Sequence, residues 1–198
     1  MTGWRTAPHS ISRSVGAVYD AIVLAGSGSR RLDGADKPGV EIRGRTLLDR
    51  VVAATAGAQR VIVVGPRRDT ELEVIWTSEE PPGGGPVAAI AAGLGEVHEQ
   101  WCLVLASDLP KIRGAVPVLL TAAADADVAV LDTAGRRNYL AAVWRTAVLR
   151  QAIERLDTVA DAAARDLFEG WNIADVSDRD EWGIDLDTWE AIEQARRG

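Results

Sequence analysis

The stretch that decides the fold is Tyr19-Asp-Ala-Ile-Val-Leu24, which runs directly into Ala25-Gly-Ser-Gly-Ser-Arg-Arg-Leu-Asp-Gly-Ala-Asp-Lys37. The first six residues predict a β-strand, because apolar and β-branched side chains predominate there. Gly26, Gly28 and Gly34 follow in the loop, and glycine lets backbone N–H groups approach an anion closely. A strand that ends in such a loop favours an α/β fold with a ligand at the strand end.

The same loop concentrates positive charge in an acidic chain. Arg30, Arg31 and Lys37 lie within it, and guanidinium and ammonium groups both bind phosphate oxygens. Glycine-rich turns with solvated basic residues are also common on protein surfaces, and that interpretation stays open. The position directly after the first strand favours phosphate binding.

Two familiar phosphate-binding loops do not match this one. A P-loop places Ser or Thr after its lysine, whereas Pro38 follows Lys37. A dinucleotide fingerprint needs a third glycine where Arg31 stands, and the second predicted strand is followed by Gly65-Pro-Arg-Arg68 rather than by an acidic ribose ligand. A hydride-transferring dinucleotide enzyme is therefore disfavoured.

Strands and helices alternate along the rest of the chain. This alternation predicts an α/β fold, namely a three-layer, Rossmann-like, mostly parallel sheet with helices on both faces. The predicted strands lie at 19–24, 60–64, 71–76, 101–106, 127–131, 139–144 and 171–176. The predicted helices lie at 45–56, 86–97, 115–124, 147–156, 159–168 and 188–196.

Ligands of such sheets bind beyond the carboxyl ends of the strands, which selects two further loops. Residues 78–86 contain three consecutive glycines and lead into a helix, so a ligand can approach the backbone there; a plain surface loop is the alternative. Asp108 follows the apolar run 101–106 and suits Mg²⁺, which binds one or two carboxylates together with substrate phosphates. An aspartate at a strand end is also a common turn former or helix cap.

An acidic pair, Asp185-Leu-Asp-Thr188, precedes the last predicted helix. Asp187 is predicted either to cap that helix, with Glu190 completing a capping box, or to contribute to the metal site. Cys102 lies in the apolar run of a predicted strand, so we expect a core residue rather than a nucleophile.

The composition limits the class of protein. A chain of 198 residues with 47% hydrophobic residues fits one globular domain, expected at 19–198 after a flexible tail at 1–18. The net charge of -7 argues against nucleic acid and anionic membranes as partners. No apolar run approaches the roughly 20 residues of a membrane span. The single cysteine is consistent with a reducing compartment, and we expect a cytoplasmic protein.

These motifs together resemble a known family. The stretch from Leu24 to Lys37 is similar to the signature Leu-Ala-Gly-Gly-x-Ser/Ala-x-Arg-Met-Gly-x-Asp-Lys of the molybdenum-cofactor guanylyltransferases, which have the nucleotide-diphospho-sugar-transferase-like fold. Similar motifs follow in order: Gly44-Arg-Thr-Leu-Leu48, Pro82-Gly-Gly-Gly-Pro-Val-Ala-Ala-Ile90, Ser107-Asp-Leu-Pro110 and Asp185-Leu-Asp-Thr188. The resemblance implies a Mg²⁺-dependent nucleotidyltransferase that moves GMP from GTP to molybdopterin and releases pyrophosphate.

The resemblance also implies roles for individual residues. The implied nucleotide-binding residues are Leu24, Ala25, Gly26, Ser27, Gly28, Lys37, Gly65, Glu79, Gly85 and Asp108. Lys37 would neutralise triphosphate charge and Arg30 or Arg31 would act at the leaving pyrophosphate, so the predicted catalytic residues are Arg30, Lys37 and Asp108. Asp108 and Asp187 are the predicted Mg²⁺ ligands. Residues 136–138 are expected either in the acceptor pocket or in a solvated hairpin.

Three positions depart from the family pattern. Ser27 replaces a glycine, Asp33 stands where glycine is usual, and Gly65 stands where the family often has an asparagine near guanine. Two alternatives to GMP transfer therefore stay open. One is a nucleotidyltransferase with another phosphorylated acceptor and CTP or a further triphosphate as donor. The other is a nucleotide-binding or assembly protein without catalysis.

Overall fold

The computed structural model of this protein describes residues 18–26 and 36–197. Its main sheet contains β1 (Tyr19–Leu24), β4 (Val61–Val64), β5 (Ile75–Thr77), β6 (Trp101–Ala106), β7 (Val128–Thr133), β8 (Arg136–Arg145) and β9 (Ile173–Ser177). These strands lie in the order β5-β4-β1-β6-β8-β7-β9. Every pairing is parallel except those of β8, which runs antiparallel to β6 and β7. The predicted mostly parallel sheet is confirmed.

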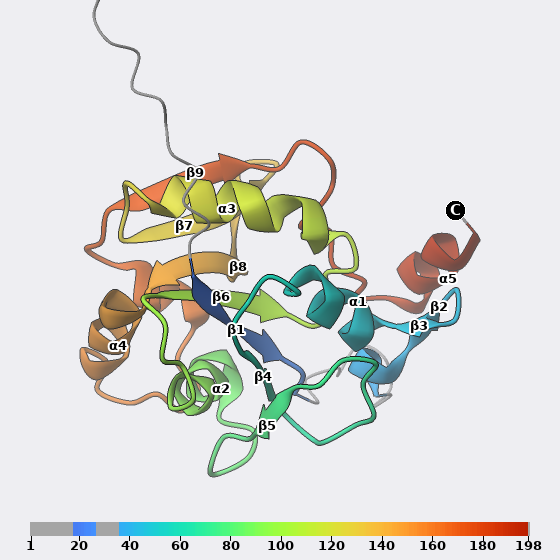
Figure 1. Cartoon of the computed structure of the whole chain (residues 1–198), viewed down its shortest axis with the longest axis horizontal. Coiled ribbons are helices and arrows are strands. Elements are labelled where there is room, and N and C mark those ends of the chain that lie inside the picture. Colours follow the sequence, from blue (N-terminus) through green and yellow to red (C-terminus); the bar gives the residue numbers. More distant parts are fainter. Residues whose placement is uncertain (1–17, 27–35, 198) are drawn as a thin grey trace, which may run out of the picture.

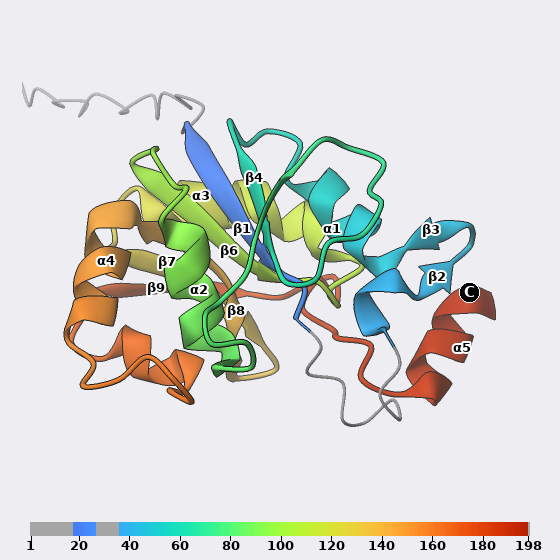
Figure 2. The same cartoon turned by 90° about the horizontal axis from the view of Figure 1, so that it is seen from below.

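Helices cover both faces of this sheet, as Figures 1 and 2 show. On one face α1 (Leu47–Ala54) and α3 (Ala115–Ala123) contribute to the core that contains Ala21 and Val23 of β1. On the other face α2 (Gly85–Leu94) and α4 (Thr146–Glu154) contribute to the core that contains Ile22. Alternate residues of β1 thus enter different cores, because side chains of a strand point to opposite faces in turn. The three-layer architecture follows from this alternation.

Cys102 lies in the interior of this sheet. It is a fully buried residue of β6, and burial raises the pKa of its thiol. The prediction of a core cysteine is confirmed. None of the helices within the described ranges is long and apolar enough to cross a bilayer.

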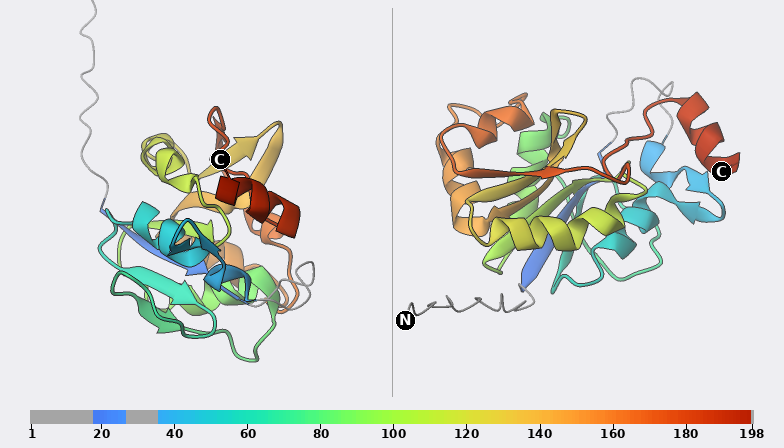
Figure 3. Two further views of the ribbon diagram at one scale, coloured as in Figure 1. Left: turned by 90° about the vertical axis from the view of Figure 1, so that its right-hand side faces the viewer. Right: turned by 90° about the horizontal axis from the view of Figure 1, so that it is seen from above.

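A smaller cluster of elements lies at one end of the sheet. The short 3-10 helix η2 (Lys37–Gly39) leads into a hairpin of β2 (Glu41–Ile42) and β3 (Arg45–Thr46), which the sequence did not predict. The C-terminal helix α5 (Trp189–Arg197) lies beside this hairpin, as Figures 1 and 3 show. Ile42 and Leu47 form a satellite core with Leu186 and Ile192. This core attaches the end of the chain to the segment after Lys37.

The predicted helix at 159–168 is wrong. Only the 3-10 helix η4 (Ala164–Phe168) forms there; another short 3-10 helix, η3 (Ile112–Gly114), precedes α3. Asp161 has a φ of 59°, which an α-helix does not allow. Its backbone N–H donates to the carbonyl of Gly84 at 2.8 Å instead of to a helical partner. A tertiary contact therefore replaces the local hydrogen bond on which the prediction relied.

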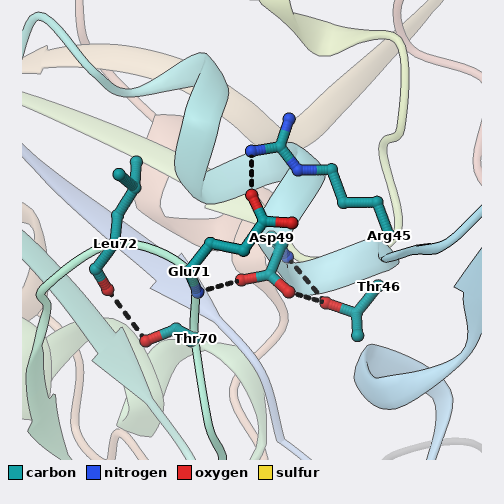
Figure 4. A network of polar contacts seen from close by, with 6 residues as sticks. All are labelled: Arg45, Thr46, Asp49, Thr70, Glu71 and Leu72. Carbon is teal, nitrogen blue, oxygen red and sulfur yellow. Dashed lines mark hydrogen bonds and ion pairs between the residues drawn. The ribbon is translucent and has the colours of Figure 1, made fainter.

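The predicted strand at 71–76 is wrong over its first four residues, since β5 spans only Ile75–Thr77. The backbone N–H of Glu71 donates to the carboxylate of Asp49 at 2.9 Å, and the Glu71 side chain pairs with Arg45. Thr46 caps α1 by accepting from the Asp49 amide, and its hydroxyl donates to the Asp49 carboxylate (Figure 4). This network fastens the loop between β4 and β5 to the start of α1.

Candidate functional site

A cavity of about 1130 Å³ lies beyond the carboxyl ends of β1, β4 and β6. Ligands of parallel α/β sheets bind at this edge. Three predicted loops meet there, because parallel strands end on the same side of a sheet. The predicted site residues that line the cavity are Leu24, Gly26, Lys37, Gly65, Glu79, Gly85, Asp108 and Asp187. Lys37 and Asp187 lie near opposite ends of the chain, yet both line this cavity.

Lys37 is the electrostatic centre of this site. Its Nζ donates to Oδ2 of Asp108 at 2.6 Å and to Oδ1 of Asp187 at 2.5 Å, and its side chain is 12% exposed. Burial by itself lowers the pKa of this ammonium, but the hydrogen bonds and charges of the two aspartates outweigh burial and raise the pKa above its usual value. Lys37 therefore stays protonated at the rim of the cavity.

Three carboxylates gather around Lys37. Asp108, Asp185 and Asp187 each offer an oxygen, and these oxygens lie within 4.8 Å of one another. Burial, followed by the charges of Asp187 and Asp108, raises the pKa of Asp185, while Lys37 opposes this rise. An all-oxygen set with surplus negative charge fits a hard divalent cation such as Mg²⁺. Asp185 belongs to this cluster although the sequence analysis did not name it as a ligand.

A backbone contact fixes the C-terminal acidic pair against β6. The N–H of Leu186 donates to the carbonyl of Asp108 at 3.3 Å, and the Leu186 side chain enters the satellite core. Asp178 orders the preceding turn by accepting from the N–H groups of Trp182 and Gly183, each at 2.9 Å. Both ends of residues 178–186 are therefore anchored, which holds Asp185 and Asp187 beside Asp108.

The alternative that Asp187 caps the last helix is wrong. The hydroxyl of Thr188 accepts from the N–H of Ala191 at 3.2 Å, three residues further on. Thr188 is thus the N-cap residue of α5, and Glu190 lies inside the first turn rather than completing a capping box. The carboxylate of Asp187 instead pairs with Lys37.

The glycine-rich loop at 78–86 forms another wall of the cavity. Glu79 accepts a hydrogen bond from the N–H of Gly83 at 3.0 Å, which closes the loop on itself. Pro86 lies in the first turn of α2, where a missing N–H is tolerated, and Gly85 has a φ of 86°. The sequence predicts that a ligand can approach the backbone of these glycines. At Gly84 the protein itself makes such an approach, because the Gly84 carbonyl accepts a hydrogen bond from the N–H of Asp161.

Gly65 has a structural reason to be glycine. Its φ is 143°, and a Cβ there would lie 2.6 Å from the carbonyl oxygen of Ala25. The ends of β4 and β1 thus pack backbone to backbone beneath the cavity. Ala25 is fully buried in that contact and does not line the cavity. Ser27, Gly28, Arg30, Arg31 and Asp33 lie outside the described residues.

A second cavity of about 660 Å³ lies next to the first. Leu140 lines both cavities, and the acidic cluster lies between them, because Asp185 lines the second while Asp108 and Asp187 line the first. Residues 136–138 line this second cavity, together with Arg165. Residues 136–138 also belong to β8, which pairs with β7 in a hairpin. Their part in an acceptor pocket stays a prediction.

Residues 21–176 match the family model of the MobA-like NTP transferase domain. The chain belongs to this family. A molybdenum cofactor guanylyltransferase of Rhodopseudomonas palustris (strain BisB5) is 31% identical to it over 75% of this chain and 81% of the relative. A molybdenum cofactor guanylyltransferase of Acidiphilium cryptum (strain JF-5) is 30% identical over 71% of this chain and 73% of the relative. The predicted family resemblance and the prediction of a nucleotidyltransferase are confirmed.

Solved structures of MobA-like and related transferases share the fold. Molybdopterin-guanine dinucleotide biosynthesis protein A of Archaeoglobus fulgidus superposes with a TM-score of 0.70 at 21% identity, over 90% of this chain and 97% of that one. The 2-C-methyl-D-erythritol 4-phosphate cytidylyltransferase of Thermus thermophilus gives a TM-score of 0.72 at 21% identity, over 91% and 98%. The predicted nucleotide-diphospho-sugar-transferase-like fold is confirmed.

Some residues at the MobA-like site were missed by the sequence analysis. Arg67 lines the first cavity, and Arg68 pairs with Asp36 immediately before Lys37. The sequence shows two consecutive arginines after a strand, but it does not show in which direction each side chain points. The Asp-x-Asp pattern at 185–187 could have identified Asp185 as a further ligand, because it places two carboxylates close together along the chain.

Proposed function

We propose that the chain transfers GMP from GTP to a phosphate of a molybdopterin-type acceptor, with Mg²⁺, and releases pyrophosphate. The observation that carries the proposal is the position of Lys37, held between Asp108 and Asp187 at the rim of a cavity of about 1130 Å³. Ligand pockets of about 300–1,000 Å³ accept drug-sized molecules, and a nucleoside triphosphate falls in that class.

The first cavity is the proposed donor site. Its walls include the backbone of Gly26, Gly65 and Gly85, against which the base and ribose can lie. The carboxylate of Glu79 is an acceptor that suits the N–H groups on the Watson–Crick edge of guanine. The triphosphate then points toward Lys37 and the acidic cluster.

The second cavity is the proposed acceptor site. Arg136, Arg137 and Arg165 line it, and arginine binds phosphate oxygens through paired N–H donors. Asp175 already pairs with Arg137, at 2.6 Å, so Arg136 is the more direct candidate for the acceptor phosphate. Because the acidic cluster separates the two cavities, donor and acceptor phosphates meet at that cluster.

The reaction is an in-line displacement at the α-phosphorus. An oxygen of the acceptor phosphate forms the new P–O bond, and the bond from the α-phosphorus to the oxygen bridging to the β-phosphate breaks. The electron pair leaves with pyrophosphate. An ionised phosphate nucleophile needs no general base, so the chain supplies positioning and charge stabilisation.

Lys37 supplies much of that stabilisation. Its pKa is raised, so its ammonium keeps the charge that balances the triphosphate. Asp108, Asp185 and Asp187 would hold the Mg²⁺ ion, which when bound would neutralise phosphate oxygens of the donor and the leaving pyrophosphate. Arg30, named as catalytic on the sequence resemblance, lies outside the described residues and remains a proposal.

Calorimetric titration with GTP, CTP, ATP and UTP in Mg²⁺ tests this function, together with an assay of pyrophosphate release in the presence of molybdopterin. We expect selective GTP binding, and a loss of turnover of about 10²- to 10³-fold in Asp108→Asn, as for removal of one group that stabilises transition-state charge. Asp125→Asn is the matched control, since Asp125 is exposed before β7, at the opposite edge of the sheet.

Each outcome of this titration has a distinct meaning. Selective CTP binding would replace the donor but keep the nucleotidyltransferase. GTP binding without pyrophosphate release would favour a nucleotide-binding protein without catalysis. Equal turnover in Asp108→Asn and wild type would sink the site assignment.

A further inference from the structure

Arg68, in the loop between β4 and β5, donates several hydrogen bonds. Its Nε donates to both carboxylate oxygens of Asp36, at 2.9 and 2.8 Å, and one of its terminal nitrogens also pairs with Asp36. The other terminal nitrogen donates to the backbone carbonyls of Ala25 at 3.2 Å and Pro66 at 2.7 Å. The Arg68 side chain is only 15% exposed, so these contacts fix the guanidinium in one place.

Two partners of Arg68, Ala25 and Asp36, lie before and after the glycine-rich loop that follows β1 in the sequence. Ala25 directly follows β1, and Asp36 directly precedes Lys37. A single guanidinium therefore joins the point where the chain leaves the first strand to the point where it enters η2. Asp36 does not use its side chain to cap η2, so its carboxylate serves Arg68.

Two neighbouring features of the backbone accommodate this pair. A Cβ on Gly39 would lie 2.6 Å from Oδ2 of Asp36, so glycine at 39 permits the carboxylate to reach Arg68. The loop that carries Arg68 is itself held, because Gly65 donates to the carbonyl of Thr77 at 2.9 Å. Further along, Glu71 is tied to Asp49 at the start of α1 (Figure 4). Arg68 thus projects from a loop with both ends anchored.

We infer that Arg68 is a positioning residue that sets the direction of the Lys37 ammonium through Asp36. Lys37 follows Asp36 in the chain, and its Nζ must reach both Asp108 and Asp187. An ion pair at a partly exposed site adds little stability, but a fork of N–H donors on a carboxylate fixes orientation. A misplacement of about 1 Å in a charge-stabilising group costs about 10²-fold in rate. This inference rests on the proposed function of Lys37 toward the triphosphate.

The test compares Arg68→Ala and Arg68→Lys with Arg145→Ala. Arg145 is a matched control, because its guanidinium also joins distant backbone carbonyls, those of Ala124 and Ala126, each at 3.0 Å. It does so at the amino end of β6, away from the cavity, where it also stacks on Trp101. Loss of Arg145 therefore reports the structural cost of removing such an arginine.

Three quantities are measured for each variant: the affinity for GTP, the ratio of kcat to the KM of each substrate, and hydrogen exchange. We expect Arg68→Ala to raise the KM for GTP and to lower kcat, so that kcat/KM for GTP falls by about 10- to 100-fold. The KM for the acceptor should not change. Arg68→Lys should recover only part of the loss, since an ammonium has no fork. Amides of Gly39 and Val40 should exchange faster in Arg68→Ala and not in Arg145→Ala.

A double-mutant cycle decides whether the effect passes through Asp36. If it does, Arg68→Ala combined with Asp36→Ala is no worse than either change alone. Multiplicative losses, or a GTP affinity and kcat in Arg68→Ala within twofold of wild type, would overturn the inference. If wild type binds no nucleoside triphosphate, the proposed function fails by itself. Hydrogen exchange at Gly39 and Val40 then still decides whether Arg68 holds this segment in place.

Discussion

The two neighbouring cavities differ in how their charges are balanced. In the first cavity, the ammonium of Lys37 already has protein partners, because it lies between the carboxylates of Asp108 and Asp187. In the second, Arg137 pairs with Asp175 at the surface, and Arg136 is an exposed arginine at the rim. Both cavities contact the same acidic cluster, and each has an exposed arginine, Arg67 in the first and Arg136 in the second, but Lys37 is held between two carboxylates.

This difference indicates how each cavity can bind an anion. A phosphate that enters the first cavity must compete with Asp108 and Asp187 for Lys37, and a divalent cation on those carboxylates would relieve the competition. A phosphate that enters the second cavity meets arginines directly. Anion binding in the first cavity, the proposed donor site, is therefore expected to depend on metal, whereas anion binding in the second cavity is not.

The largest effect is expected for Lys37→Ala. This change removes the ammonium that faces the triphosphate, and we expect turnover to fall by about 10²- to 10³-fold. It also leaves three carboxylates within 4.8 Å without their lysine, so the variant should melt at a lower temperature that recovers on addition of Mg²⁺. Pyrophosphate release and thermal melts with and without Mg²⁺ measure the two effects.

Lys111→Ala serves as the control for Lys37→Ala. Lys111 lies close to Asp108 in the sequence but pairs with Glu181 at the surface and does not line the first cavity. If the melting temperature of Lys37→Ala did not change on addition of Mg²⁺, this result would contradict the proposed balance of charge in the first cavity.

A smaller effect, confined to one substrate, is expected for Arg136→Ala. Loss of a hydrogen bond to a charged group costs about 1.5–3 kcal/mol, which corresponds to about 10- to 100-fold in the acceptor KM. The affinity for GTP should stay within twofold of wild type, because Arg136 lines only the second cavity. Steady-state kinetics with each substrate varied in turn measure the split.

Arg113→Ala is the comparison for Arg136→Ala, since Arg113 is exposed and lines neither cavity. Equal losses of GTP and acceptor affinity in Arg136→Ala would remove the distinction between the two cavities.

The smallest effect is expected for Asp178→Asn, which loosens the turn that leads to the acidic cluster. Burial alone raises the pKa of Asp178, but hydrogen bonds from the backbone of Gly183 and Trp182 and from Thr133 lower it below its usual value overall. A depressed folded-state pKa stabilises the fold above the unfolded pKa, and this contribution is lost as the pH falls through the folded pKa. The variant should therefore be less stable than wild type at neutral pH, by about 1–2 kcal/mol.

Denaturant unfolding of wild type and Asp178→Asn across pH measures this contribution. The difference in unfolding free energy should shrink below about pH 4, where the aspartate becomes protonated. A difference that is constant with pH would show that the Asp178 charge does not order this turn.

Local patterns were sufficient to predict the strands whose ends line the first cavity. The strand predicted at 19–24 has those bounds in the structure, and so does the strand at 101–106. Both are apolar runs buried by helices on two faces, so their own residues carry the signal. Lys37 and Asp108 were predicted because each lies in a loop after such a strand, and loop position at the sheet edge follows from strand direction.

Predictions failed where a contact distant in sequence replaced a local one. Asp161 gives its amide to Gly84 rather than to a helix, and Glu71 gives its amide to Asp49 rather than to a strand. Asp187 sits at a position typical of a helix cap, but Thr188 takes that role. For Asp161 and Glu71 a tertiary hydrogen bond replaced the local one, whereas at Asp187 the neighbouring Thr188 makes the cap and the carboxylate pairs with Lys37.

The sequence by itself therefore determined the α/β architecture, the edge of the sheet at which the cavity lies, and the presence of Lys37 and Asp108 at that edge. The tertiary structure alone decided which carboxylates meet Lys37, since Asp187 is 150 residues away in the chain. It also decided the direction of Arg68, which reaches Asp36 across 32 residues. The physical reason is that strand and loop signals reside in adjacent residues, whereas ion pairs depend on how separate elements pack.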